Sequence, residues 1–156
     1  MMKIPLVFIL HDVRSMNNVG ALFRTADALG LERLFLCGLT GCPPHREIQK
    51  TALGATETVP WEWVQRTEEA IIKLRSEEFS IIALEQTPDA ISLENFHPSG
   101  KTALIVGNEI EGIPHSISTL CDQTLVIQQF GAKKSMNVAV AGGIAGWWLS
   151  VKLRGT

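Results

Sequence analysis

Three segments of this sequence combine glycine with polar side chains in a way that could form a ligand-binding site. They are residues 11–24, residues 107–112 and residues 128–137. The polar residues that stand out within them are Asn18, Arg24, Asn108, Glu109, Lys133, Lys134, Ser135 and Asn137. Arginine can bind a phosphate through two parallel hydrogen bonds, and glycine lets a backbone approach a ligand closely. The three segments therefore predict one site, provided that the fold brings them together.

Each segment also has an explanation that involves no chemistry. Asn18 can cap a helix, and Arg24 can be a solvated side chain beside the apolar face of that helix. The sequence GNEIEG from Gly107 can be a simple turn. Ser135 can cap the last helix, although a cap does not explain the two lysines and the asparagine beside it. Spacing alone leaves both interpretations open.

The elements that would position these segments alternate along the chain. Apolar runs predict strands at residues 5–10, 33–38, 80–85, 102–107 and 124–128. Helices are predicted from Asn17 or Asn18 to Leu29, after Pro43 and Pro44, and at residues 67–78, 114–120 and 137–151. Continuously apolar strands that alternate with helices predict an α/β fold with a mainly parallel sheet and helices on both faces. Ligands bind such sheets beyond the carboxyl ends of the strands, where all three segments fall.

The predicted last helix contains three glycines, Gly142, Gly143 and Gly146. Each costs about 1 kcal/mol relative to alanine in a helix interior. We therefore expect another backbone to pack closely there, either from the sheet or from a second subunit.

Length and composition exclude several classes of protein. The 156 residues fit a single domain, and a net charge of −2 is not that of a protein that binds nucleic acid with its whole surface. Three cysteines without a C-x-x-C pair favour neither a disulfide framework nor zinc, and they suit the cytoplasm. The apolar run from Met1 to Leu10, which we interpret as a strand, is too short to span a membrane. The scattered histidines predict no metal site, and neither a dinucleotide fingerprint nor a P-loop is present.

Taken together, the three segments resemble the signature motifs of the SpoU/TrmH branch of the SPOUT RNA methyltransferases. The first motif, N-x-G-A-x-x-R-x-A-x-A-x-G, runs from Asn18 to Gly30. The second, G-N-E-x-x-G, runs from Gly107 to Gly112, and the third, S-[LM]-N-V-x-V-A, from Ser135 to Ala141. Three motifs in the right order, each after a predicted strand, are specific, and the resemblance covers nearly the whole chain.

The resemblance implies a fold with a deep C-terminal trefoil knot, which sequence reasoning alone would reject because knots are rare. It also implies a homodimer whose interface includes the helix after the first motif and the last helix, which gives Gly142, Gly146 and Trp147 a second interpretation. Residues 1–156 would form a single SPOUT domain without the separate RNA-binding extension that many relatives carry.

The activity implied is methylation of a ribose 2′-hydroxyl in tRNA or rRNA, with S-adenosylmethionine as methyl donor and no metal. Asn18, Arg24, Glu109, Ser135 and Asn137 match the family's catalytic and substrate-side positions. The donor would be held largely by backbone groups near Leu84, Gly107, Ile127 and Met136. The chain has Gln128-Gln129-Phe130 where relatives often have Pro-Met, which puts the contacts around the adenine in doubt.

The family's general base is proposed to be the matching arginine. Because guanidinium does not normally release its proton, we expect Arg24 instead to bind the phosphate beside the target ribose and to stabilise the developing alkoxide. Candidates for an RNA-facing patch are Arg14, Arg46, Lys50, Lys133 and Lys134, each of which could equally be a solvated surface charge. Two other functions stay open: a base-directed SPOUT methyltransferase, and a non-catalytic RNA-binding dimer.

Overall fold

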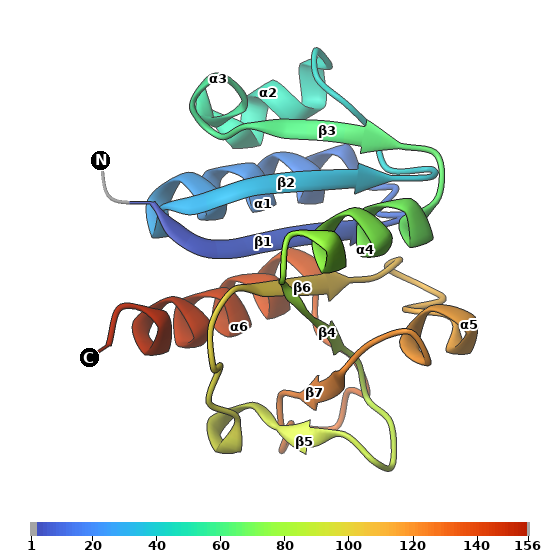
Figure 1. Ribbon diagram of the computed structural model, residues 1–156. Coiled ribbons are helices and arrows are strands. Elements are labelled where there is room, and N and C mark those ends of the chain that lie inside the picture. The colour runs from blue at the N-terminus through green and yellow to red at the C-terminus, as the bar shows by residue number, and fades with distance from the viewer. Residues whose placement is uncertain (1–2, 156) are drawn as a thin grey trace.

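The computed structural model describes residues 3–155 and contains one seven-stranded parallel sheet (Figure 1). The strand order is β3-β2-β1-β6-β4-β7-β5. The bounds are β1 Ile4–His11, β2 Leu31–Cys37, β3 Trp61–Val64, β4 Ser80–Leu84, β5 Ile91–Ser92, β6 Thr102–Val106 and β7 Gln123–Val126. Met1 and Met2, at the start of the apolar run expected to be a strand, lie outside the described residues.

Helices cover both faces of this sheet, as the sequence predicts. Alternation along β1 sends Leu6, Phe8 and Leu10 into the apolar cluster that contains residues of α1 and α6, and sends Val7 and Ile9 into the cluster beneath α4. The helices are α1 Met16–Leu29, α2 Arg46–Ala52, α3 Ala55–Thr58, α4 Thr67–Ser76, α5 His115–Ser118 and α6 Val138–Leu153, with a 3-10 turn, η1, at Leu93–Asn95. The predicted α/β architecture is therefore confirmed.

The start of α1 differs from the expectation. The cap is Ser15, whose hydroxyl accepts a hydrogen bond from Asn18 N at 3.2 Å, so the prediction of Asn17 or Asn18 as the cap is wrong. Several residues of the preceding loop can cap a helix, and the turn that the chain makes after β1 decides between them. Because Asn18 lies within the first turn, its side chain is left for other contacts.

The start of α6 also differs. Asn137 is the cap, and its Oδ1 accepts from the backbone N–H groups of Ala139 at 2.8 Å and Val140 at 3.1 Å. The alternative in which Ser135 caps this helix is therefore wrong. Ser135 is exposed in the loop that precedes the helix, where its hydroxyl points to no first-turn N–H group among the described residues.

Two of the three glycines of α6 lie against side chains of the same chain. A Cβ on Gly142 would stand 2.8 Å from Leu22 Cδ2, and one on Gly146 would stand 2.7 Å from Phe8 Cζ. The close approach expected at these glycines is confirmed, but the neighbours are side chains of α1 and β1 rather than another backbone. The interpretation of Gly142 and Gly146 as interface residues is therefore wrong, since both are buried within the chain.

Two strands were not expected from the sequence, β3 and the two-residue β5. β3 forms one edge of the sheet, and its side chains are only partly buried, so it lacks a continuous apolar run. All neighbouring strands pair in parallel, which places their carboxyl ends along one edge of the sheet. The first motif begins in the first turn of α1, the second lies in the loop after β6, and the third spans the start of α6, so all three begin near this edge.

Candidate functional site

Glu109, in the loop after β6, holds the segment that leads into α1. Its Oε1 accepts the backbone N–H of Arg14 at 3.1 Å, and its Oε2 accepts that of Ser15 at 2.9 Å. Oε2 also accepts the Asn18 side-chain amide at 3.1 Å. One carboxylate thus ties the second sequence motif to the first, across 91 residues of chain.

These donors affect the ionisation of Glu109. Partial burial on its own raises the pKa of the Glu109 carboxyl, but the backbone N–H groups of Ser15 and of Glu109 itself, the Asn18 amide and the Arg14 N–H outweigh it. The pKa of Glu109 is therefore lowered, and the carboxylate stays ionised at neutral pH.

Asn18 links this pair to the third motif. Its Oδ1 accepts the Asn137 side-chain amide at 3.2 Å, so Asn18 contacts both Glu109 and Asn137. Because the Asn137 Oδ1 is occupied by the first turn of α6, the orientation of its amide is fixed at both ends. Three of the five expected catalytic residues therefore form one hydrogen-bonded cluster at the N-termini of α1 and α6.

A tight turn after β6 sets the position of Glu109. Asn108 and Gly112 pair through two backbone hydrogen bonds, and Gly112 has a left-handed φ of 67°. A Cβ on Gly112 would stand 2.2 Å from Glu85 Oε2, and one on Gly107 would stand 2.6 Å from the Gly112 backbone. The backbone contact at Gly107 and the left-handed φ at Gly112 explain glycine at both positions of G-N-E-x-x-G.

A pocket of about 220 Å³ lies beside the cluster. Its walls include all four residues expected near the methyl donor, which are Leu84, Gly107, Ile127 and Met136. Glu109, Lys134 and Ser135 also line it, so the pocket joins the second motif to the third. Gln129 lies in the wall as well, where relatives often have Pro-Met.

Arg24 does not join the cluster. It lies six residues after Asn18, which is about 9 Å along the axis of α1 and roughly 120° around it. The side chain is exposed and makes no hydrogen bond or ion pair with any residue that the structure describes. Its guanidinium is therefore free to bind an outside ligand.

The five expected RNA-facing residues are all exposed, on three separate segments. Arg14 follows β1, Arg46 and Lys50 belong to α2, and Lys133 and Lys134 precede α6. Lys50 Nζ stands 3.8 Å from Glu47 Oε2, which partly offsets its charge.

Sequence reasoning missed Asp12, which links the loops along this edge of the sheet. Its Oδ1 accepts the Leu39 N–H at 2.8 Å, and its backbone carbonyl accepts the Asn108 side-chain amide at 2.7 Å. Asp12 has a left-handed φ of 49°, and a Cβ on Gly38 would stand 2.3 Å from its Oδ1. The sequence signal, an aspartate directly after a buried strand, is common, and its role depends on the backbone turn.

Glu85, after β4, was also missed. Its Oε2 accepts the Ile113 N–H at 2.8 Å, and its Oε1 accepts the Gln86 N–H at 2.9 Å. Glu85 thereby fixes the far end of the turn that contains Glu109 and forms part of the pocket wall.

Residues 3–155 contain neither a group of metal-ligating side chains nor a membrane-spanning helix. Within that range, no three His, Cys, Asp or Glu side chains are placed so that they could hold a metal ion. None of the helices within it has the length and apolar character needed to cross a membrane.

Known proteins match this chain over the residues that form the site. The profile of the SpoU rRNA Methylase family matches residues 5–147. The chain is 30% identical over 140 residues to a 23S rRNA (guanosine-2′-O-)-methyltransferase of Neisseria meningitidis serogroup B, covering 90% of this chain and 56% of the relative. It is 28% identical over 149 residues to a tRNA (guanosine(18)-2′-O)-methyltransferase of Borreliella burgdorferi, covering 96% and 67%.

Among solved structures, the AdoMet-bound rRNA methyltransferase from Sinorhizobium meliloti superposes with a TM-score of 0.86 at 27% identity. The match covers 92% of this chain and 54% of that one, so the chain spans little more than half the length of several proteins that it matches. Because the family profile covers residues 5–147, which contain all three motifs and the whole site, the chain belongs to the SpoU rRNA methylase family.

Proposed function

We propose that the protein is an RNA methyltransferase that transfers a methyl group from S-adenosylmethionine to a ribose 2′-hydroxyl in tRNA or rRNA. The observation that carries this proposal is the pocket lined by Leu84, Gly107, Ile127 and Met136 next to the cluster of Glu109, Asn18 and Asn137. Relatives named as ribose methyltransferases of 23S rRNA and of tRNA support both the reaction and the substrate class.

The residues around the pocket fit the proposed methyl donor. Leu84, Val106 and Ile127 provide apolar surface for a purine ring, and the turn from Gly107 to Gly112 brings backbone close to the cavity. When bound, the donor supplies an activated methyl group on a positively charged sulfur. The acidic side chains of Glu85, Glu109 and Glu111 in the wall suit such a charge.

In the proposed mechanism, the cluster of Glu109, Asn18 and Asn137 positions the groups that meet the acceptor. Glu109 fixes the start of α1, and Asn137 fixes the start of α6 next to Ser135. Arg24 binds the phosphate beside the target ribose and stabilises the ribose oxygen as that oxygen loses its proton to a phosphate oxygen or to another group. Positioning within about 3–3.5 Å is the main requirement, because the methyl group is already activated.

Substitution of Arg24 tests the proposed mechanism. Arg24→Ala is expected to abolish methylation of RNA while S-adenosylmethionine still binds, as measured by calorimetric titration. Arg24→Lys keeps the charge but loses the two-pronged geometry, so partial activity would favour an electrostatic role over proton removal. Near-normal methylation by Arg24→Ala would contradict both versions of the mechanism.

The methylated nucleoside in cellular RNA would identify the substrate. We expect mass spectrometry of tRNA and rRNA nucleosides, from a strain lacking this protein, to show the loss of one 2′-O-methylated nucleoside. Loss of a ring-methylated nucleoside would instead favour a base-directed enzyme. Absence of S-adenosylmethionine binding would favour the alternative of a non-catalytic RNA-binding dimer.

We also propose a homodimer built on α1 and α6. Val140, Ile144 and Trp147 are exposed at helical spacing on α6, with Trp147 56% exposed, and together they form an apolar stripe. Because Arg24 does not share the face of α1 that carries Asn18, we propose that Arg24 of one protomer serves the pocket of its partner.

Mixed dimers test this arrangement. Arg24→Ala and Ser135→Ala are each expected to be inactive alone, but a mixed dimer keeps one intact site if Arg24 acts across the interface. Co-expression in equal amounts should then restore about a quarter of the wild-type activity, since half of the dimers are mixed and each has one working site. No recovery would show that Arg24 acts within its own chain.

We propose that the C-terminal region is knotted, as in the resembling family. The arrangement of α6 supports this, because Trp148 Nε1 donates to Phe96 O at 3.2 Å on the β5–β6 connection while Gly146 packs against Phe8 of β1 on the other side. Pulling both chain ends apart should leave a knotted chain shorter than about 3.3–3.6 Å per residue. Pulling from the N-terminal end and from a Thr119→Cys variant should untie it, and equal lengths per stretched residue in both experiments would exclude a knot.

Residues 1–156 form one SPOUT domain in this proposal, and the protein acts in the cytoplasm, where its RNA substrates are made. Limited proteolysis and cell fractionation test these two points. Early cleavage into two stable fragments, or recovery outside the cytoplasm, would contradict them.

A further inference from the structure

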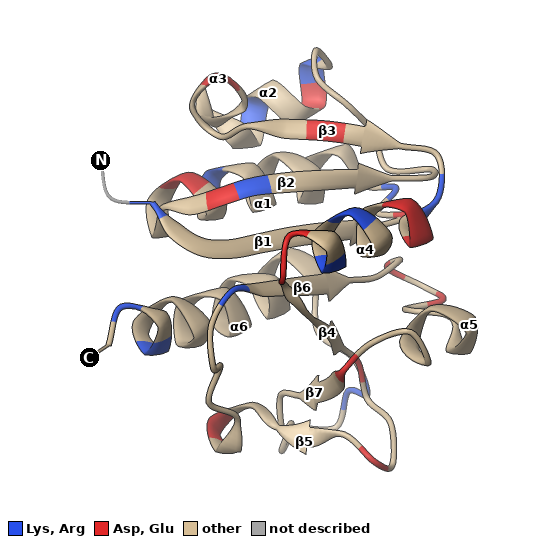
Figure 2. Cartoon of the chain, viewed as in Figure 1, with Lys and Arg blue, Asp and Glu red and all other residues tan. Residues whose placement is uncertain are grey.

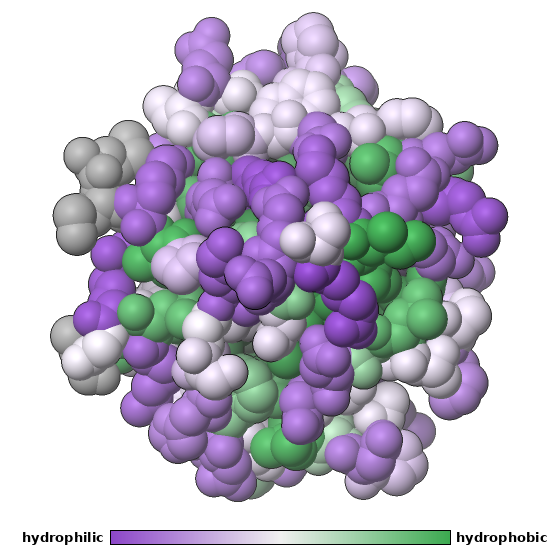
Figure 3. Space-filling model, viewed as in Figure 1, coloured by the Kyte–Doolittle hydropathy of each residue, from purple (hydrophilic) through white to green (hydrophobic). Residues whose placement is uncertain are grey.

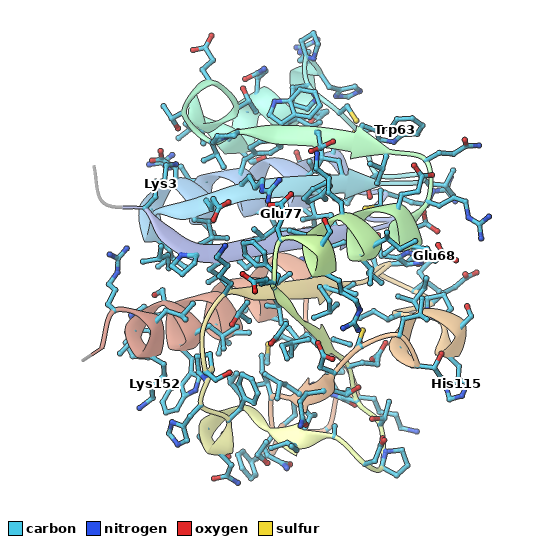
Figure 4. The ribbon with its side chains drawn as sticks, in the orientation of Figure 1. Lys3, Trp63, Glu68, Glu77, His115 and Lys152 are labelled. Carbon is cyan, nitrogen blue, oxygen red and sulfur yellow. The ribbon has the colours of Figure 1, made fainter. Side chains whose placement is uncertain are left out.

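An exposed tryptophan stands at the same edge of the sheet as the candidate site. Trp63, the third residue of β3, is 48% exposed, and Leu39, in the loop after β2, is 65% exposed. Figure 4 shows Trp63 at the carboxyl end of β3, apart from Glu68 at the start of α4. Neither residue is needed for the core, so their exposure calls for an explanation.

The indole is held in place by its polar edge. Trp63 pairs with Leu36 in the register of β3 and β2, and its Nε1 donates to the carbonyl of Gly38, the residue directly after β2, at 3.0 Å. The ring is therefore fixed along the edge of the sheet while about half of its surface stays in water. A ring that is already oriented loses little entropy when it binds a flat ligand.

Trp63 faces the side of the sheet that carries α1 and α2. Trp61 packs edge-on against Phe23 of α1, while Glu62 binds Lys73 of α4 at 2.8 Å. Since side chains alternate along a strand, Trp63 lies on the same face as Trp61. This is also the face of α1, whose first turn carries Asn18.

Charge favours an anionic ligand on this face over the opposite one. The loop beside Trp63 leads to His45 and to the exposed Arg46 at the start of α2, and Arg14 is exposed after β1. On the opposite face, the first turn of α4 carries Glu68 and Glu69 (Figure 2). The basic side chains later in α4, Lys73 and Arg75, are paired with Glu62 and Asp122. The surface over α4 shows both hydrophilic and hydrophobic side chains (Figure 3).

Hydrogen bonds connect the platform to the site. The Trp63 indole donates to the carbonyl of Gly38, and the N–H of the next residue, Leu39, donates to the Asp12 carboxylate. The Asp12 carbonyl in turn accepts the side-chain amide of Asn108, the residue before Glu109. β3 lies two strands from β1 and three from β6, or about 10 and 14 Å at the usual strand spacing. At 3.4 Å per stacked nucleotide, this is roughly three to four nucleotides.

We propose that Trp63, with Leu39 beside it, forms a platform on which a base of the RNA substrate stacks, a few nucleotides from the target ribose. Unpaired bases are commonly recognised by stacking on aromatic side chains, which tolerates any base identity. The proposal rests on RNA being the substrate, and it adds a binding subsite that the three sequence motifs do not contain.

Substitution with matched controls tests the platform. Trp63→Ala should weaken binding of unfractionated tRNA and of a single-stranded A10 oligoribonucleotide roughly 5- to 150-fold, the usual range for one stacked base. Trp63→Phe keeps a ring but loses the bond to Gly38, so its loss should be smaller. Ile72→Ala, at a residue of α4 that is 69% exposed, should bind RNA like the wild type. Affinity for S-adenosylmethionine should change little in all three variants, and each should still unfold cooperatively above the temperature of the binding assay.

Ultraviolet cross-linking of the wild-type protein gives a second readout. The tryptic peptide spanning residues 51–66 should carry cross-linked A10, with fragmentation placing it on Trp63. The proposal is overturned if Trp63→Ala binds both RNAs within about twofold of the wild type, well below the range for stacking. It is equally overturned if cross-links form only at other residues. The same holds if Trp63→Ala leaves RNA affinity unchanged but alters the molecular mass measured by sedimentation, which would indicate that Trp63 contacts another protein chain.

The outcomes separate this proposal from the proposed function. If the wild type methylates RNA and Trp63→Ala binds and methylates equally well, only the platform is refuted. If RNA binding depends on Trp63 but no RNA is methylated, the proposed activity fails while the platform stands.

Discussion

At the scale of single residues, the site depends on one carboxylate that accepts three hydrogen bonds. Glu109→Gln would keep one acceptor oxygen but would set an NH₂ donor against a backbone N–H group. We expect lower stability at pH 7 and at least a tenfold slower methyl transfer, since a charge-assisted hydrogen bond contributes about 1.5–3 kcal/mol when shielded from water and less at this exposed position. Urea unfolding and steady-state kinetics measure the two effects.

The lowered pKa of Glu109 also predicts a pH dependence. A carboxyl with a depressed folded-state pKa stabilises the protein above the unfolded value of about 4.3, and this contribution disappears as pH falls through the folded value. The difference in urea midpoint between wild type and Glu109→Gln should therefore shrink from pH 7 to pH 3. Glu111→Gln is the control, because the Glu111 carboxylate accepts no hydrogen bond from any described residue. A difference that stays constant with pH would contradict the prediction.

Asp12 holds the loops next to the site through its side chain and its backbone turn. Two substitutions separate these two roles. Asn tolerates a left-handed φ and keeps an acceptor for the Leu39 N–H, whereas Ala does neither. Asp12→Ala should lower the free energy of unfolding by about 2 kcal/mol, and Asp12→Asn by less than half of that. Urea unfolding compares them, and equal losses would show that the acceptor and the turn do not matter.

The resemblance supplied the identities of the site residues, and the structure supplied the contacts that join them. Glu109, Asn18 and Asn137 could be named from the motifs, but their mutual hydrogen bonds could not. The role of Asp12 depends on a φ of 49°, which no residue pattern near it indicates. The same holds for Trp63, because its Nε1–H reaches a neighbouring strand that sequence reasoning did not pair with it.

At the scale of elements, the sequence predicted what local periodicity determines. The recurrence of apolar residues at helical spacing predicted α1, and the continuous apolar runs predicted β1 and β6. The two-residue β5 is too short for any pattern, and edge strand β3 is only half buried. The strand order could not be predicted, because β6 lies between β1 and β4 as a result of packing between distant segments.

The glycines of α6 give a test at this scale. Gly146→Ala should destabilise the protein by about 1–3 kcal/mol, because the new methyl group would overlap Phe8. Gly143 has nothing within 4 Å of its Cβ position, so Gly143→Ala should stabilise the helix by up to about 1 kcal/mol. Thermal unfolding of both variants measures the difference. A loss of stability in Gly143→Ala would indicate that a partner protomer packs against this position.

At the scale of the whole molecule, the parallel sheet separates the site from the chain ends. The carboxyl ends of the strands carry the cluster, the pocket and Trp63, and both described ends of the chain lie at the opposite side (Figure 1). The net charge is only −2, so we expect the proposed affinity for RNA to come from a local group of basic residues and not from the whole surface.

This distribution of charge predicts a steep but limited dependence of RNA binding on salt. If Arg14, Arg46, Lys50, Lys133 and Lys134 each neutralise one phosphate, the affinity should fall roughly 100- to 500-fold between 50 and 200 mM salt. Fluorescence anisotropy with unfractionated tRNA measures this slope, and Lys133→Gln with Lys134→Gln should make it shallower by about the contribution of two phosphates.

A dimer that presents both edges to one RNA would have a slope steeper than five contacts allow. Ile144→Asp, placed in the apolar stripe of α6, should then bring the slope back to that of one protomer, and a flat response to salt would refute the basic patch altogether.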